Sequence, residues 1–269
     1  MDSAALPDGA PTALEITDLA VHIGGLVILE RMSLSVPKGK IVSLIGPNGA
    51  GKTTAFNIIT GYMTPSAGSV RFEGHDLLGM TPDDIAALGL VRTFQRTSIF
   101  AGCSVADNVL TAMHLRGRCG LFGAIFRTPS SLREEARLRA EVDDVLHFVG
   151  LQGRAGENAG SLAYGEQRLL GLAIALAARP KLLLLDEPAA GLNPSETERF
   201  KELVRLIRDD GVTVLLVEHN MHMVMSVSDK VFVLNQGRII ASGPPAAIQS
   251  NPEVIKAYLG TGLKKRAKA

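Results

Sequence analysis

Two kinds of hydrophobic pattern run along the chain, and together they predict strands of two types. Residues 14–23 and 27–36 alternate apolar and polar side chains on either side of Gly24-Gly25, which predicts antiparallel strands. By contrast, residues 41–45 and 182–185 are almost wholly apolar. Such runs are typical of parallel strands that are buried on both faces of a sheet. The pattern therefore indicates a buried parallel sheet accompanied by antiparallel β-structure.

Segments with helical spacing or helix-start signals alternate with the strands. Pro82 follows Thr81 and precedes two acids, a typical helix start, and Asn193-Pro194 is another. Asn235-Gln236-Gly237 predicts a hairpin turn. We expect further strands at 69–73, 90–95, 213–217, 230–234 and 238–241, and helices at 54–60, 82–88, 106–115, 132–149, 162–178, 194–209, 244–250 and 252–259. This alternation indicates an α/β fold with a mainly parallel, doubly wound sheet and an antiparallel edge.

Changes in composition suggest the domain boundaries. Residues 1–12 are small and rich in proline and glycine, so we expect disorder there, before a domain spanning 13–260. Residues 98–180 are mainly helical and are interpreted as a lobe inserted into the sheet domain; surface helices of one domain are the alternative. Residues 261–269 hold a basic cluster, interpreted as a solvated tail or as a contact for anionic lipid.

Charge and cysteine content exclude several classes of function. The 28 Lys and Arg residues nearly balance the 27 Asp and Glu residues, and the net charge of +1 argues against nucleic acid as a partner. Cys103 and Cys119 lack metal-ligand spacing and are interpreted as free thiols in a reducing compartment. The longest apolar runs are about ten residues, and crossing a bilayer takes about 20, so we expect no membrane span.

The stretch that follows the apolar run 41–45 has the pattern of a phosphate-binding loop. Its glycines let backbone N–H groups turn inward, and the helix that follows adds partial positive charge. Lys52 can neutralise the outer phosphates, and the Thr53 hydroxyl can bind Mg²⁺. The alternative is a glycine turn without a nucleotide. The predicted ATP-binding residues here are Gly46, Pro47, Asn48, Gly49, Ala50, Gly51, Lys52, Thr53 and Thr54.

Four polar side chains follow other predicted strands, where ligands bind in open α/β sheets. Asp186 is suited to hold Mg²⁺, and Glu187 could orient the water that attacks a phosphate. His219 could contact the γ-phosphate or act as a structural hydrogen-bonding group. Gln95 could join the Mg²⁺ shell, position water or cap a loop. These residues, with Lys52, predict phosphoryl transfer from ATP to water.

In this order, the motifs of residues 14–260 resemble the ATP-binding subunit of ABC transporters. The resemblance identifies Gly46–Thr53 as Walker A, Gln95 as the Q-loop, residues 182–187 as Walker B and His219 as the switch histidine. Asn193 ends the D-loop. The resemblance implies a P-loop ATPase cassette with an antiparallel β subdomain and an inserted helical lobe. The resemblance also implies a signature motif that faces the nucleotide of a second cassette. Its residues are Leu162, Ala163, Tyr164, Gly165, Glu166 and Gln167.

Finer motifs resemble branched-chain amino-acid importers, in particular their LivG-like subunit. These are residues 92–95, 120–122, 128–129, 162–165, 189–194, 217–219 and 251–260. The resemblance implies a second cassette, either a copy of this chain or a companion ATPase, two transmembrane permease subunits and, indirectly, a solute-binding protein. It also implies a peripheral location on the cytoplasmic face of the cell membrane.

Three positions depart from the family pattern. Ile23 stands where an aromatic residue usually stacks on adenine, so aliphatic packing would replace stacking there. Ala163 replaces the signature serine, and Asn193 replaces the commoner aspartate. Because Lys52, Asp186, Glu187 and His219 are all present, we expect ATP hydrolysis.

Other functions are compatible with the same motifs. An importer for urea or other amides, or an exporter of the lipopolysaccharide type, would share the core residues. A nucleotide-dependent regulatory or scaffold protein is the non-enzymatic alternative, suggested by Ile23 and Ala163. Hydrolysis that depends on Lys52 would argue against this last interpretation.

Overall fold

The computed structural model describes residues 11–93, 99–114 and 129–258, and these divide into two compact units. Among the described residues, the first unit comprises 11–92, 181–189 and 201–258, and the second comprises 93, 99–114, 129–180 and 190–200. The predicted N-terminal segment 1–12 lies outside the described residues except for Pro11 and Thr12, and Thr12 is the first residue of a strand. The basic tail also lies outside them.

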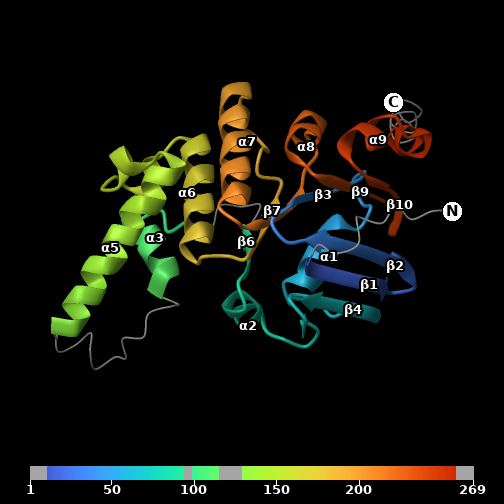
Figure 1. Ribbon diagram of the computed structural model, residues 1–269, viewed down its shortest axis with the longest axis horizontal. Coiled ribbons are helices and arrows are strands. Elements are labelled where there is room, and N and C mark those ends of the chain that lie inside the picture. The colour runs from blue at the N-terminus through green and yellow to red at the C-terminus, as the bar shows by residue number, and fades with distance from the viewer. Residues whose placement is uncertain (1–10, 94–98, 115–128, 259–269) are drawn as a thin grey trace. The chain divides into compact units, whose positions relative to one another are not determined.

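A four-stranded antiparallel sheet forms one layer of the first unit (Figure 1). Its strands follow the order β2-β1-β4-β5, and Leu14 pairs with Val36 on one side and with Phe72 on the other. The alternation seen in the sequence places one face of this sheet in the core and leaves the other polar. The strands are β1 (Thr12–Ile23), β2 (Leu26–Pro37), β4 (Ala67–Phe72) and β5 (His75–Asp76).

A six-stranded sheet forms the second layer, in the order β10-β9-β3-β8-β7-β6. Strand β3 is parallel to β8 and β9, β7 is parallel to β8, and β10 is an antiparallel edge strand. The predicted parallel sheet with an antiparallel edge is confirmed. The strands are β3 (Ile41–Ile45), β6 (Leu90–Thr93), β7 (Leu182–Asp186), β8 (Thr213–Val217), β9 (Lys230–Asn235) and β10 (Arg238–Gly243).

Alternate side chains of the central strands enter two different apolar clusters. Val42 and Leu44 pack with α1 (Lys52–Ile59) and the antiparallel sheet, in a core that includes Phe56. Ile45 faces the other way, toward α8 (Met221–Val227), α9 (Pro245–Gln249) and the helical residues 252–258. Because both faces are covered, these strands are almost wholly apolar, as the sequence predicted.

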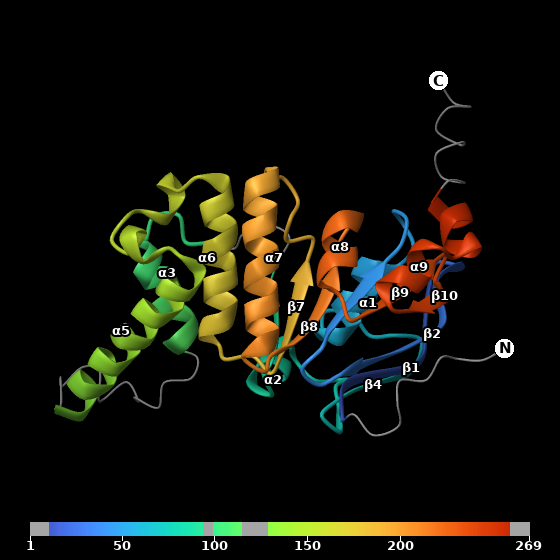
Figure 2. The same cartoon turned by 45° about the horizontal axis from the view of Figure 1, so that its top comes forward.

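The second unit is helical (Figure 1 and Figure 2). Its helices α3 (Val105–His114), α5 (Pro129–Val149) and α6 (Tyr164–Ala177) contact one another. Val142, Leu146 and Val149, which are spaced to share one face of α5, are buried. Single 3₁₀ turns at Gln152–Arg154 and Ala159–Ser161 lead into α6.

Most predicted elements are present, with boundaries shifted by a few residues. Helices α2 (Pro82–Ala87) and α7 (Pro194–Asp209) begin at the predicted prolines. The hairpin turn is confirmed: Gln236 and Gly237 have φ values of 47° and 80° between β9 and β10. Helix α8 was not predicted. Among the described helices, none is long and apolar enough to cross a membrane.

Candidate nucleotide-binding site

The predicted phosphate loop connects β3 to α1 and has the backbone geometry that its glycines require. Gly46, Gly49 and Gly51 have φ values of 156°, 80° and 108°. A Cβ on Gly46 would collide with the carbonyl of Leu234, so this glycine is also needed for close approach to β9. Helix α1 has no side-chain cap, which leaves the amides of its first turn available to an anion.

Lys52 is folded back onto this loop. Its Nζ donates to the carbonyls of Gly46 and Pro47 at 2.7 and 3.1 Å, and the residue is only 6% exposed. Burial lowers the pKa of Lys52, whereas the nearby carboxylates of Glu187 and Asp186 raise it. The pKa of Lys52 is lowered overall, because burial outweighs the attraction of the two strand-end carboxylates.

Glu187 and His219 are in direct contact at the ends of β7 and β8. The Nε2 atom of His219 lies 2.7 Å from Oε1 of Glu187. Glu187 has φ of 48°, uncommon for a residue with a side chain, and its amide donates to Val217 O at 2.8 Å. This strained backbone directs the carboxylate away from the strand and toward the histidine. A carboxylate and an imidazole held together can orient a water molecule and move a proton.

Glu218 supports this pair, a role that the sequence analysis missed. It is buried, and its carboxylate accepts hydrogen bonds from the amides of Ala189, His219 and Asn220 at 2.7, 2.8 and 3.0 Å. The single side chain therefore fixes the loops that follow β7 and β8. The sequence did contain a signal for this role, because Glu218 stands between an apolar strand and a predicted site histidine.

Asp186 forms a buried ion pair with Arg92, which sequence analysis had not assigned to the site. Arg92 Nη2 and Asp186 Oδ2 are 2.6 Å apart, and the side chains are 9% and 6% exposed. Within the described part of the chain, the Asp186 carboxylate accepts a hydrogen bond at Oδ2 only. The other oxygen is available to a solvent molecule or a cation.

The oxygen donors here fit a magnesium ion held mainly by phosphate. No group of three or more His, Cys, Asp or Glu side chains that could hold a metal is found among the described residues. Thr53 is exposed at the start of α1, and Asp186 offers a carboxylate oxygen. Mg²⁺ commonly binds through one or two protein oxygens, substrate phosphates and water. Gln95, the third predicted ligand, lies outside the described residues.

The remaining predicted ATP-binding residues belong to the first unit: Pro47, Asn48 and Ala50 to the loop itself, Thr54 to α1 and Ile23 to β1. Pro47 and Thr54 are partly buried, Asn48 is exposed and Ala50 is buried. Ile23 ends β1 and is 54% exposed, next to a hairpin tip where Leu26 and Val27 are also exposed. Exposed aliphatic side chains can pack on a planar base, although more weakly than an aromatic ring.

The predicted signature residues begin α6 in the second unit. Glu166 accepts a hydrogen bond from the amide of Ala163 at 3.1 Å, and Gln167 donates to the carbonyl of Leu162 at 3.0 Å. The Tyr164 hydroxyl donates to Ala190 O at 3.1 Å. Gly165 is buried against the Glu196 side chain, which leaves no room for a Cβ unless that chain moves. These contacts fix the shape of the motif, while Ala163 and Tyr164 remain exposed.

Asn193, the predicted D-loop residue, caps α7. Its Oδ1 accepts from the amide of Glu196 at 2.9 Å and from the Ser195 hydroxyl at 2.7 Å. Glu196 in turn accepts from the Asn193 amide at 2.9 Å, so the two residues form a reciprocal cap. The commoner aspartate could accept the same bonds, which explains how asparagine substitutes here.

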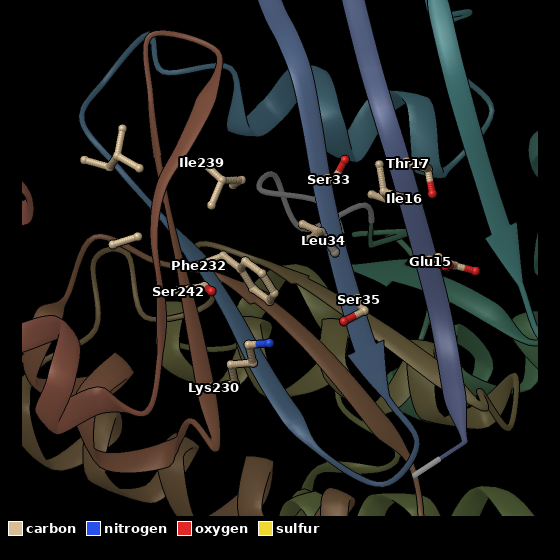
Figure 3. A pocket seen from close by; sticks show the side chains of 12 residues that line it. Glu15, Ile16, Thr17, Ser33, Leu34, Ser35, Lys230, Phe232, Ile239 and Ser242 are labelled. Carbon is tan, nitrogen blue, oxygen red and sulfur yellow. The ribbon is translucent and has the colours of Figure 1, made fainter. Parts of the chain in front are cut away.

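A groove of about 850 Å³ lies elsewhere in the first unit, between the antiparallel sheet and the β9–β10 hairpin (Figure 3). Its walls include Glu15, Ser33, Ser35, Lys230 and Phe232. None of its lining residues belongs to the predicted nucleotide site. The groove is therefore separate from the chemistry described above.

Comparisons with known proteins agree with these motifs. Residues 29–190 match the family described as "ABC transporter", and residues 238–264 match "Branched-chain amino acid ATP-binding cassette transporter". The chain is 44% identical over 248 residues to the high-affinity branched-chain amino acid transport ATP-binding protein BraF of Pseudomonas aeruginosa, covering 92% of this chain and 97% of that protein. It is 42% identical to LivG of Escherichia coli K12, with the same coverage.

A solved structure shows the same fold. An ATP-binding cassette of an ABC transporter in its ADP conformation has a TM-score of 0.81 and 30% identity, covering 93% of this chain and 99% of that one. The chain therefore belongs to the ABC transporter family, as an ATP-binding cassette.

Proposed function

We propose that this chain is the ATP-hydrolysing subunit of an importer for branched-chain amino acids. The observation that carries the hydrolytic part is the Glu187–His219 pair, in which Oε1 of Glu187 and Nε2 of His219 lie 2.7 Å apart. The substrate class is supported by the identity to BraF and LivG and by the C-terminal match at residues 238–264.

In the proposed mechanism, the protein supplies positioning and charge. The amides of the phosphate loop and Lys52 bind the phosphates, and Ile23 packs on the base. Glu187 accepts a hydrogen bond from the attacking water, and His219 holds that carboxylate and contacts the γ-phosphate. Thr53, Gln95 and Asp186 would hold Mg²⁺, which neutralises charge on the phosphate oxygens when bound.

The proposed assembly contains a second cassette, two transmembrane permease subunits and a solute-binding protein that reaches the cassettes indirectly. The signature residues 162–167 would face the nucleotide of the second cassette, which is a copy of this chain or a companion ATPase. The existence of BraG, a second branched-chain amino acid transport ATP-binding protein of P. aeruginosa, supports a companion. We place the subunit on the cytoplasmic face of the cell membrane, held there by the permeases.

The hydrolytic role is tested with Glu187→Gln, which keeps the shape of the side chain and removes its capacity to accept a proton. We expect ATP turnover to fall at least about 100-fold, with nucleotide binding retained, because general-base catalysis contributes about that much. Lys52→Ala should weaken nucleotide binding in addition to lowering ATP turnover. Phosphate release and fluorescent-nucleotide titration measure the two effects. Wild-type turnover in Glu187→Gln would refute the assignment.

The substrate class needs a separate test in membranes. The complex is isolated, its companion subunits are identified, and uptake of labelled leucine and of labelled urea is compared in a strain that lacks the chain. Leucine uptake that returns with the wild-type chain and stays absent with Glu187→Gln supports the proposal. Restored urea uptake without leucine uptake would favour the amide importer instead.

A further inference from the structure

The side chain of Arg92 is only 9% exposed at the candidate metal site, although the nucleotide motifs do not require an arginine there. It belongs to β6, next to β7 in the six-stranded sheet, and its guanidinium is paired with Asp186 at 2.6 Å. Buried ion pairs contribute little net stability, because desolvation offsets most of their attraction. A buried arginine at this position therefore calls for a reason other than stability.

The guanidinium is held in place by two residues of α1 and by Thr60, which caps the end of that helix. Arg92 Nη1 donates to Asn57 Oδ1 at 2.8 Å and to Thr60 Oγ1 at 3.4 Å. Its Cζ lies 5.5 Å from the centre of the Phe56 ring, a distance typical of a cation–π contact. Helix α1 is the helix that begins with Lys52 and Thr53. Arg92 thus ties the phosphate-loop helix to the acid at the end of β7.

The geometry assigns Arg92 a positioning role: it orients the Asp186 carboxylate so that Oδ1 is presented to the cation bound with ATP. The fixed guanidinium holds Oδ2, and the described contacts leave Oδ1 available. Outer groups of this kind set the orientation of metal-binding side chains in many proteins. This inference rests on the proposed function, in which Asp186 helps to hold Mg²⁺.

Two substitutions loosen this arrangement but keep a positively charged side chain at position 92, beside Asp186. Arg92→Lys keeps the positive charge but loses the rigid fork of donors. Asn57→Ala keeps Arg92 and removes its best anchor on α1. Arg238→Lys is the control, because Arg238 is an exposed arginine of the same unit that pairs with Glu30. Asp186→Asn reports on the metal role itself, and thermal unfolding checks that each variant is folded.

The measurement is the affinity for Mn²⁺, used as a paramagnetic substitute for Mg²⁺. Mn²⁺ is titrated into a one-to-one complex of protein and non-hydrolysable ATP analogue, and free Mn²⁺ is followed by electron paramagnetic resonance. Nucleotide affinity is measured separately in EDTA. We expect Mn²⁺ affinity to fall about 10-fold in Arg92→Lys and less in Asn57→Ala, with cation-free nucleotide affinity within about 2-fold of wild type.

The outcomes separate the inference from the proposed function. If Asp186→Asn weakens Mn²⁺ binding but Arg92→Lys and Asn57→Ala do not, Arg92 has no positioning role. If Arg92→Lys lowers the cation-free nucleotide affinity as much as the Mn²⁺ affinity, Arg92 supports the structure of the site as a whole and does not position Asp186 for the cation. Wild-type Mn²⁺ binding in Asp186→Asn would instead refute the proposed metal role of that acid, and the inference with it.

Discussion

Gly46 and Gly49 belong to the same loop but differ in what surrounds them. Both have positive φ, at 156° and 80°. A Cβ on Gly46 would overlap the carbonyl of Leu234, whereas nothing lies within 4 Å of the corresponding position on Gly49. The first glycine is required by packing and conformation, the second by conformation alone.

This difference predicts unequal effects of alanine at the two positions. Gly49→Ala should cost about 1 kcal/mol of unfolding free energy from backbone strain. Gly46→Ala should cost on the order of 2 kcal/mol more, because β3 and β9 must separate to admit the methyl group. Urea unfolding of the two variants provides the comparison. Equal losses would mean that the contact with β9 is unimportant.

The residues that sequence analysis found and those it missed differ in how their partners are arranged. Lys52, Asp186 and Glu187 were predicted as site residues because each stands in a short motif next to an apolar strand. Arg92 was missed as a site residue because its partner Asp186 is 94 positions away, and nothing local to Arg92 indicates a buried ion pair. Glu218 was missed for a related reason: one of its three contacts, Ala189, is 29 positions away.

At the level of elements, Glu73 links three segments of the first unit. It follows β4, and its carboxylate pairs with Lys38, just after β2, at 2.6 Å and with Lys181, just before β7, at 2.9 Å. The hydrogen bond from Lys38, then that from Lys181, lowers the pKa of Glu73. Both lysine side chains are about half exposed, so solvent screens much of the attraction.

The lowered pKa determines how the contribution of Glu73 depends on pH. The Glu73 carboxylate is stabilising where it is ionised in both the folded and the unfolded state, above its unfolded pKa of about 4.5, and this contribution disappears as pH falls through the folded value. Glu73→Gln should therefore cost about 0.5–1 kcal/mol of unfolding free energy at pH 7 and less at pH 3. Thermal unfolding at both pH values, with the exposed Glu202→Gln as control, measures this. A loss that is equal at both pH values would show that the carboxylate charge is not its source.

Elements were predicted well where local chemistry decides them. The β9–β10 hairpin follows from a Gln-Gly turn with positive φ at both residues, and α2 and α7 follow from capping residues before proline. Helix α8 was missed because its seven residues are short for a periodic pattern and its cap, Asn220, directly follows site residues. Its helical state depends on burying Met223, Val224 and Val227, which sequence alone does not show.

At the level of the whole molecule, the proposed function requires two cassettes to close on ATP. Each chain carries a phosphate loop in one unit and a signature motif in the other. In the proposed arrangement, Ala163 stands at the start of α6 with its side chain directed toward the partner's γ-phosphate. Ala163 is the N-terminal cap position of α6 and has no side chain to accept a hydrogen bond from the helix.

One substitution at Ala163 can change the stability of the free subunit and the assembly of the two cassettes in opposite directions. Aspartate is among the best N-cap residues, so Ala163→Asp should stabilise the free subunit by about 0.5–1 kcal/mol. In the closed pair, the same carboxylate would lie against a triphosphate and repel it. Ala163→Ser also caps the helix but adds no charge, and it supplies a hydroxyl that can donate to the phosphate.

We therefore expect opposite results for the two caps in a Glu187→Gln background that retains ATP. Light scattering after size exclusion should detect an ATP-dependent dimer with the parent chain and with Ala163→Ser, but none with Ala163→Asp. Urea unfolding should show that both variants are at least as stable as the parent. If the working partner is a companion ATPase, the dimer forms only when that protein is added, and the same contrast holds. A dimer that persists in Ala163→Asp would exclude the signature motif from the interface, because a buried charge facing phosphate costs several kcal/mol.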